Sequence, residues 1–292
     1  MSRNSNRTKV NHQAMPPAPQ MPNTPPTEKP NPFGISFVVP TETVYLPSGG
    51  EFYEEGSPLV GVKTLEIKAM TSKEEDIIMN SSYVDDGTVF DRLIDSLMVT
   101  EGVKAQDILD CDKMALLFSA RKTGYGDSID LLMTCKNCGT DQERDIKISD
   151  FLDKFKEETF SIRGTEEFVY DETSKTALIE LPVSKIKARI RSLLPSDYKY
   201  LEEAKAQKQK LNLPFSETIE FLRRVIVEAN GVTTQTELFQ LVEYLPSADA
   251  RKIKEVHNRT IPIMDRTFDI ECSNCGHAQK EVVPFTLGMF WN

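Results

Sequence analysis

The chain has 292 residues, of which 39% are hydrophobic and 27% are charged, and its formal net charge is −10. This composition is typical of a globular protein. No apolar run approaches the roughly 18 residues that a membrane helix needs, so we expect no membrane span. The first 30 residues contain no apolar core of a signal peptide, which favours a reducing compartment where disulfides are rare.

The N-terminal segment is rich in proline and poor in large apolar side chains. Eight of the 17 prolines lie between Pro16 and Pro32. Such a segment buries too little surface to offset the entropy of ordering, so we predict that residues 1–36 form a disordered Pro-rich arm. The arm is either a solvated tail or a tether that orders on a partner. Four basic residues and one acidic residue give the arm a net charge of +3, so the rest of the chain carries a net charge of −13. An acidic body argues against non-specific nucleic-acid binding.

Beyond the arm, the apolar pattern indicates both helices and strands. Thr71 and Glu74 form a capping-box pattern at a helix start. Apolar residues recur at helical spacing in both halves of the chain, namely Phe90, Leu93, Ile94, Leu97 and Met98, then Ile219, Leu222, Ile226 and Ala229, and then Leu238, Leu241, Val242 and Leu245. Extended patterns cover residues 128–134, 145–148, 267–271 and 281–284. The sequence therefore predicts the α+β class, with the apolar stripes forming the core.

Four of the five cysteines form two C-x-x-C-G knuckles. The first knuckle spans residues 135–139 and the second spans residues 272–276, and their cysteines are Cys135, Cys138, Cys272 and Cys275. Two residues between thiolates let one tight turn direct both sulfurs at an ion, and the following glycine supplies a positive φ. One pair gives half of a tetrahedral site. Both pairs together therefore predict a Cys₄ site that holds one structural Zn²⁺ per chain.

Other roles of the cysteines and their neighbours stay open at this point. The pairs can act as redox dithiols, although neither opens a helix after a strand. They can form disulfides, which the expected compartment disfavours, or bind nothing. His277, two residues after Cys275, is expected at the surface or beside the ligands, since four sulfurs suffice. Cys111 is expected to be a small buried hydrophobe.

The 133 residues between the two knuckles fit an internal duplication. A helix that starts at an aspartate, Asp112 or Asp249, lies 23 residues before each knuckle. A Leu-Pro pair stands farther upstream in both halves. We therefore predict two degenerate repeats, residues 37–160 and 161–292. Each would consist of helices plus a β-hairpin tipped by a knuckle, and the two would join at the shared metal site.

The sequence contains none of the common catalytic motifs. It lacks a phosphate-binding loop ending in Gly-Lys, H-E-x-x-H, G-x-S-x-G and the dinucleotide-binding glycine motif. Its three histidines show no helical metal spacing. A closed Cys₄ set also leaves no open coordination position for catalysis. These features favour a protein that is not an enzyme.

The chain ends with two large aromatic residues, Phe290 and Trp291, followed by Asn292. Large aromatics at a terminus are costly when exposed, because chain ends usually fray. Phe290 and Trp291 are therefore expected either to fold back into the second half or to anchor a partner protein.

Several short motifs occur in a fixed order along the body. They are LPSGGEFY at 46–53, MTSKEED at 70–76, LDCDKMALL at 109–117, RKTGYG at 121–126, both knuckles and the closing Phe290-Trp291. This ordered set, over residues 44–292, resembles the baseplate hub protein family of T-even-type contractile-tailed bacteriophages, also described as baseplate hub assembly chaperones. Family members do not all carry both knuckles, so the metal is argued from this sequence alone.

The resemblance implies a virion structural protein or assembly factor, without an active site, at the centre of the tail baseplate. Its partners would be other hub, wedge or tail-tube proteins in a large symmetric assembly. It would lie in the host cytoplasm during assembly and then in the virion tail baseplate. The alternative is a zinc-ribbon adaptor for nucleic acid or transcription, whose knuckle tips should be basic. Here the tips carry one basic residue in four, so we expect no nucleic-acid partner.

Overall fold

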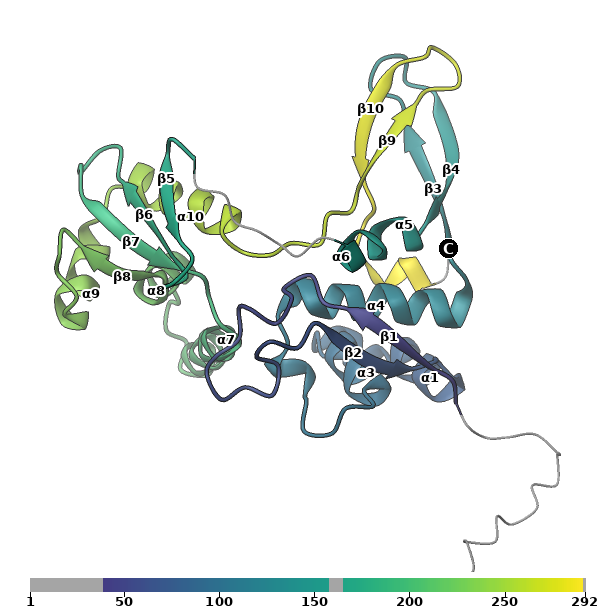
Figure 1. Cartoon of the computed structure of the whole chain (residues 1–292), viewed down its shortest axis with the longest axis horizontal. Helices are drawn as coiled ribbons and strands as arrows, with labels where there is room; N and C mark the ends of the chain where they lie inside the picture. The colour runs from purple at the N-terminus through teal and green to yellow at the C-terminus, as the bar shows by residue number, and fades with distance from the viewer. Residues whose placement is uncertain (1–38, 158–164, 291–292) are drawn as a thin grey trace, which may run out of the picture. The chain divides into compact units, whose positions relative to one another are not determined.

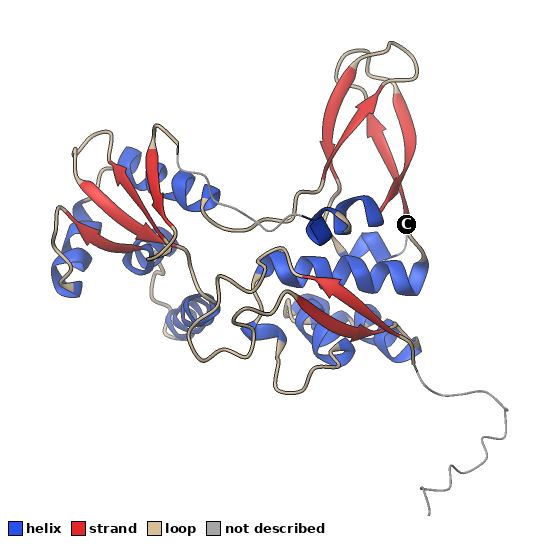
Figure 2. Ribbon diagram, in the orientation of Figure 1, coloured by secondary structure: helices blue, strands red, loops and turns tan. Residues whose placement is uncertain are grey.

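The computed structural model describes residues 39–157 and 165–290. These residues form helices and small antiparallel sheets (Figures 1 and 2), which confirms the mixed helix-and-sheet class. Within this part of the chain, no helix is long and apolar enough to cross a membrane. The predicted N-terminal arm, residues 1–36, lies outside the described residues.

The N-terminal half of the described chain forms two hairpins and a group of helices. Strands β1 (Thr41–Tyr45) and β2 (Thr64–Lys68) pair antiparallel, as do β3 (Ser128–Thr134) and β4 (Asp141–Lys147). The helices are α1 (Ser72–Met79), α2 (Ser81–Asp85), α3 (Val89–Leu97), the 3-10 turn η1 (Ala105–Asp107), α4 (Asp110–Tyr125), α5 (Ser149–Leu152) and α6 (Lys154–Glu157).

Two local predictions for these helices are confirmed. The backbone N–H and the hydroxyl of Thr71 donate to Glu74 Oε2 at 3.0 and 2.5 Å, so the capping box starts α1. Helix α3 buries its predicted stripe, with Leu93, Ile94 and Leu97 fully enclosed. Local capping and apolar periodicity therefore predict these two helices correctly.

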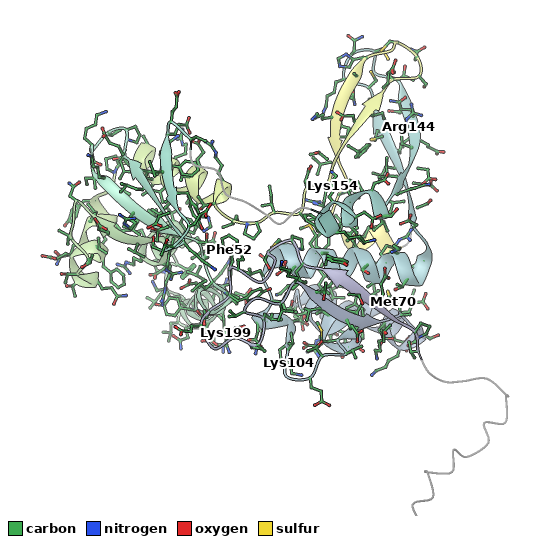
Figure 3. The ribbon with its side chains drawn as sticks, viewed as in Figure 1. Phe52, Met70, Lys104, Arg144, Lys154 and Lys199 are labelled. Atoms are coloured by element: carbon green, nitrogen blue, oxygen red, sulfur yellow. The ribbon has the colours of Figure 1, made fainter. Side chains whose placement is uncertain are left out.

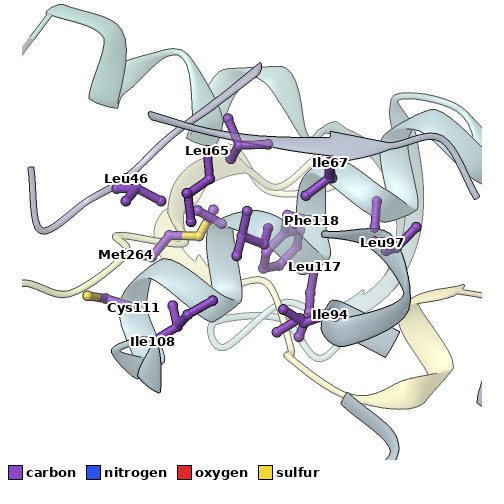
Figure 4. Packing of buried hydrophobic residues seen from close by; sticks show 14 of the residues in the cluster. Leu46, Leu65, Ile67, Ile94, Leu97, Ile108, Cys111, Leu117, Phe118 and Met264 are labelled. Carbon is purple, nitrogen blue, oxygen red and sulfur yellow. The ribbon is translucent and has the colours of Figure 1, made fainter. Parts of the chain in front are cut away.

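A first hydrophobic core gathers around α4 (Figure 4), from which Leu117 and Phe118 point among residues of β2 and α3. This core takes its buried residues from 44–152 and again from 264–290. The chain between those two segments builds a separate second core. The C-terminal segment therefore packs against residues that precede it by more than a hundred positions.

A buried charge ties the C-terminal segment to α4. Arg121 is 3% exposed, and its Nε donates to the carbonyl of Met289 at 2.7 Å. Its two terminal nitrogens donate to the carbonyls of Gly126 and Ser128 at 2.5 and 2.8 Å. One guanidinium thus joins the end of α4, the start of β3 and the closing 3-10 turn η2 (Leu287–Phe290).

The second core contains buried residues from 168–256 and lies under a four-stranded antiparallel sheet of order β5-β6-β7-β8. Its strands are β5 (Phe168–Asp171), β6 (Thr176–Glu180), β7 (Lys187–Arg191) and β8 (Ile226–Ala229). Its helices are α7 (Pro195–Lys210), α8 (Glu217–Val225), α9 (Gln235–Tyr244) and α10 (Ser247–Arg259).

The last hairpin pairs β9 (Thr267–Glu271) with β10 (Ala278–Val282). Strands β3 and β9 have their predicted bounds, whereas β4 and β10 begin nearer to the knuckles than predicted. The division into repeats 37–160 and 161–292 stays a prediction. Val283, Met289 and Phe290, although numbered within the second repeat, contribute to the first core.

Candidate metal centre

Each knuckle forms the tip of a β-hairpin and is closed by two backbone hydrogen bonds. In the first, the N–H of Cys135 donates to the carbonyl of Thr140, and the N–H of Gly139 donates to the carbonyl of Cys135, both at 2.9 Å. The second knuckle makes the same pair of bonds at the same lengths from Cys272 and Gly276. Gly139 and Gly276 have φ angles of 71° and 69°, which explains the glycine in each motif.

The two tips bring four sulfurs together (Figure 1 shows the two hairpins side by side). The Sγ atoms of Cys135 and Cys275 lie 3.7 Å apart, as do those of Cys138 and Cys272. All four lie within 4.8 Å of one another. A disulfide needs about 2.05 Å, whereas ligands 2.3 Å from a tetrahedral Zn²⁺ stand about 3.8 Å apart. This cluster of four cysteines could hold a metal ion.

The thiols lie in two environments. Cys135 and Cys272 are buried, and Cys138 and Cys275 are exposed. A hydrogen bond with the hydroxyl of Thr140 lowers the pKa of Cys138 to about 5, and the backbone N–H of Cys275 lowers the pKa of Cys272. The backbone N–H of Cys138 favours the thiolate of Cys135 as well, yet desolvation and the neighbouring thiols raise the pKa of Cys135 to about 11. A divalent cation would remove this conflict by favouring all four thiolates.

Two buried glutamines hold the knuckles against each other. Oε1 of Gln142, on β4, accepts from the backbone N–H and the hydroxyl of Ser273 at 3.1 and 3.2 Å. Oε1 of Gln279, on β10, accepts from the backbone N–H of Lys136 at 2.9 Å. Each glutamine thus reaches the residue that follows the first cysteine of the opposite knuckle. The arrangement is reciprocal.

The asparagines inside the knuckles are reciprocal in the same way. Nδ2 of Asn137 lies 3.6 Å from Sγ of Cys275, and Nδ2 of Asn274 lies 3.7 Å from Sγ of Cys138. Amide donors at these distances stabilise thiolate charge. Sequence reasoning missed the asparagines and glutamines, although both knuckles read C-x-N-C-G-x-x-Q. Aligning the two motifs would have found them.

Charged residues beside the knuckles are engaged with the opposite hairpin. Lys136, the basic residue at the tips, pairs with Glu281 at 2.6 Å. Arg144 on β4 (Figure 3) donates to the carbonyl of Glu271 at 3.0 Å. These contacts link the two hairpins in addition to the sulfurs and glutamines.

The remaining predicted site residues lie elsewhere. The side chain of His277 is exposed and is not part of the cysteine cluster. Cys111 is buried and its Sγ lies 3.6 Å from Asp112. Phe290 is fully buried in the first core, and Trp291 lies outside the described residues. The partner-binding role expected for Phe290 and Trp291 stays a prediction.

One family model matches the chain, and its description is T4 bacteriophage base plate protein. The match covers residues 39–291, which is most of the sequence. No curated protein and no solved structure matches. The matched segment contains both knuckles and leaves out the Pro-rich segment that precedes residue 39. The chain therefore belongs to the T4 bacteriophage base plate protein family.

Proposed function

We propose that this chain is a non-enzymatic structural or assembly protein of the hub region of a contractile phage tail baseplate. The observation that carries the proposal is the family match over residues 39–291. Its partners would be other hub, wedge or tail-tube proteins within a large symmetric assembly. It would act in the host cytoplasm during assembly and then lie in the virion tail baseplate.

We also propose that Cys135, Cys138, Cys272 and Cys275 bind one structural Zn²⁺ per chain. The sulfur–sulfur separations of 3.7 Å support a tetrahedral ion. Four thiolates would fill the coordination shell, which leaves no position for a substrate or a catalytic water. The ion would join two hairpins that are distant in sequence, so its binding free energy would contribute to folding.

A nucleic-acid adaptor is the less favoured role of such knuckles. Phosphate binding needs free cations at the tips. Lys136 already pairs with Glu281 at 2.6 Å, and its counterpart in the second knuckle is Ser273. These contacts support a structural role for the knuckles.

We further propose that the two halves are degenerate repeats. The carboxylate of Asp112, at the start of α4, accepts from the backbone N–H of Ser48 at 2.9 Å. The carboxylate of Asp249, in the first turn of α10, accepts from the backbone N–H groups of Val183 and Ser184 at 2.8 and 2.9 Å. Each acceptor thus fixes the loop that follows a Leu-Pro pair, and each helix leads to a knuckle hairpin.

Quantitative mass spectrometry of purified virions and of partly assembled tails tests the baseplate role. A structural component should be present in intact virions at a fixed ratio to the other baseplate proteins. An assembly factor should be enriched in the intermediates. Absence from both kinds of particle would contradict the proposal, and binding of the purified chain to DNA or RNA in place of tail proteins would favour the adaptor.

A further inference from the structure

A hollow of about 330 Å³ in the second core region is lined by three arginines. Arg191 comes from β7, and Arg223 and Arg224 come from α8. Thr233 and Gln235, at the start of α9, complete its polar lining. Among the described residues, no carboxylate lines this hollow. Three cations therefore meet in one recess without an acid among the lining residues.

A buried carboxylate beside these arginines is already occupied. Asp197 is 3% exposed and accepts from the two terminal nitrogens of Arg191 at 2.6 and 2.9 Å. It also accepts from the backbone N–H of Leu194 at 3.0 Å. Nη1 of Arg224 forms an ion pair with the same carboxylate at 3.9 Å, which is beyond hydrogen-bond distance. Asp197 therefore hydrogen-bonds to Arg191 and pairs with Arg224 only at longer range.

The other two guanidinium groups are held in place by neighbouring side chains. Arg224 stacks over Tyr200, with 3.7 Å between its central carbon and the ring centroid. Arg223 binds Glu220 and Glu243 through its terminal nitrogens at 3.2 and 2.8 Å. Its Nε is buried and has no partner among the described residues. A buried donor without an acceptor is unfavourable, and Arg223 is one of the residues that line the recess.

The start of α9 adds further donors on the same side. Thr234 is the N-cap of α9, yet its side chain makes no capping hydrogen bond. Its neighbours Thr233 and Gln235 line the hollow. The first backbone N–H groups of a helix point outward from its N-terminus and carry partial positive charge. Three arginines and the residues on either side of the N-cap of α9 therefore line one recess.

We propose that this arginine pocket, formed by Arg191, Arg223, Arg224, Thr233 and Gln235, binds the carboxylate of an acidic side chain on a partner protein. The planar fork of a guanidinium matches the two oxygens of a carboxylate. Residues 165–261 contain 15 basic and 15 acidic residues, so this region does not repel an acidic segment. The net charge of −10 on the whole chain opposes a long nucleic-acid polyanion.

A titration of the full chain with a fluorescent hexaglutamate peptide at low salt tests this site. The peptide should bind, and Arg224→Gln should weaken binding by about tenfold or more, because a hydrogen bond to a charged group is lost. Arg224→Lys keeps the charge but removes the fork, so it should recover only part of the affinity. Arg251→Gln, at an exposed position of α10, is the matched control and should bind as the wild type does.

A second variant keeps the test decisive if Arg224→Gln folds poorly. Thr233 is exposed, so Thr233→Glu should fold, and its carboxylate would fill the pocket from within the chain. This variant should lose peptide binding while its thermal unfolding stays that of the wild type. The proposal is wrong if the wild type does not bind the peptide or if Thr233→Glu and Arg224→Gln bind it normally. It is also wrong if a single-stranded oligonucleotide binds more tightly than the peptide.

Discussion

Replacement of Gln279 by alanine should weaken metal binding without touching a ligand. The residue is buried on β10, and its Oε1 accepts from the backbone N–H of Lys136 at 2.9 Å. Its Nε2 donates to the carbonyl of Thr134 at 3.3 Å. Both bonds cross from the second hairpin to the first. Truncation removes them together and leaves the N–H of Lys136 without this acceptor.

The magnitude follows from these two bonds. Each is worth about 1 kcal/mol, so Gln279→Ala should cost about 2 kcal/mol in holding the knuckles together. Metal affinity should then fall roughly thirtyfold. Gln142→Ala should cost about half as much. Nε2 of Gln142 is buried without a partner among the described residues, so truncation also removes the free-energy cost of that unpaired donor.

Competition for Zn²⁺ against a chromophoric chelator measures both effects on the full chain. The matched control is Gln240→Ala, at an exposed position of α9, which should bind metal as the wild type does. We expect Gln279→Ala to bind Zn²⁺ more weakly than Gln142→Ala, and both to bind it more weakly than Gln240→Ala. Equal affinities for all three variants would refute the inference that cross-hairpin hydrogen bonds position the ligands.

Two further predictions concern the folded body. Burial lowers the pKa of His257 to about 4, so the unfolded chain binds the proton more readily and stability should fall by about 3 kcal/mol between pH 6.5 and pH 4. In urea unfolding, His257→Gln should reduce the pH dependence of the free energy of unfolding, whereas His277→Gln, at an exposed position, should retain it. An unchanged pH dependence in His257→Gln would contradict this account. Gly50→Ala should cost 3 kcal/mol or more, because φ is 77° and a Cβ would collide with the backbone of Val62. Gly102→Ala, with φ of 80° and open space around it, should cost only about 1–2 kcal/mol in the same assay. Equal stability losses in the two variants would contradict the predicted collision at Gly50.

The sequence predicted those parts of the site that depend on local spacing. Two C-x-x-C-G motifs between extended segments specify two hairpin tips, and the four-sulfur cluster lies where that pattern indicates. The partners across the hairpins were not predicted, because Gln142 and Gln279 become neighbours of the opposite knuckle only when the hairpins meet. The buried position of Arg121 was equally hidden, since a charged side chain in a helix is usually solvated.

The second core contains elements that apolar periodicity in the sequence does not predict well. In β7 the buried Ala188 and Ile190 alternate with three cationic residues, which is a weak signal in a strand of five residues. Helix α7 has a weak apolar face, because only Tyr198 and Leu201 pack against the second core and its one fully buried residue is Asp197. Pro195, at its first turn, is the local indication of that helix. A search for apolar periodicity therefore misses short charged strands and polar helices, whereas it detects the apolar stripe of α3.

Native mass spectrometry of the purified full chain, with and without a chelator, tests the central claim most directly. We expect a mass that corresponds to one Zn²⁺ per chain. Cys135→Ser and Cys275→Ser should lose that ion, and the control Cys111→Ser should keep it. Chelation should lower the unfolding temperature of the wild type, because metal binding is coupled to folding. A metal-free mass, together with an unfolding temperature that the chelator leaves unchanged, would contradict the account.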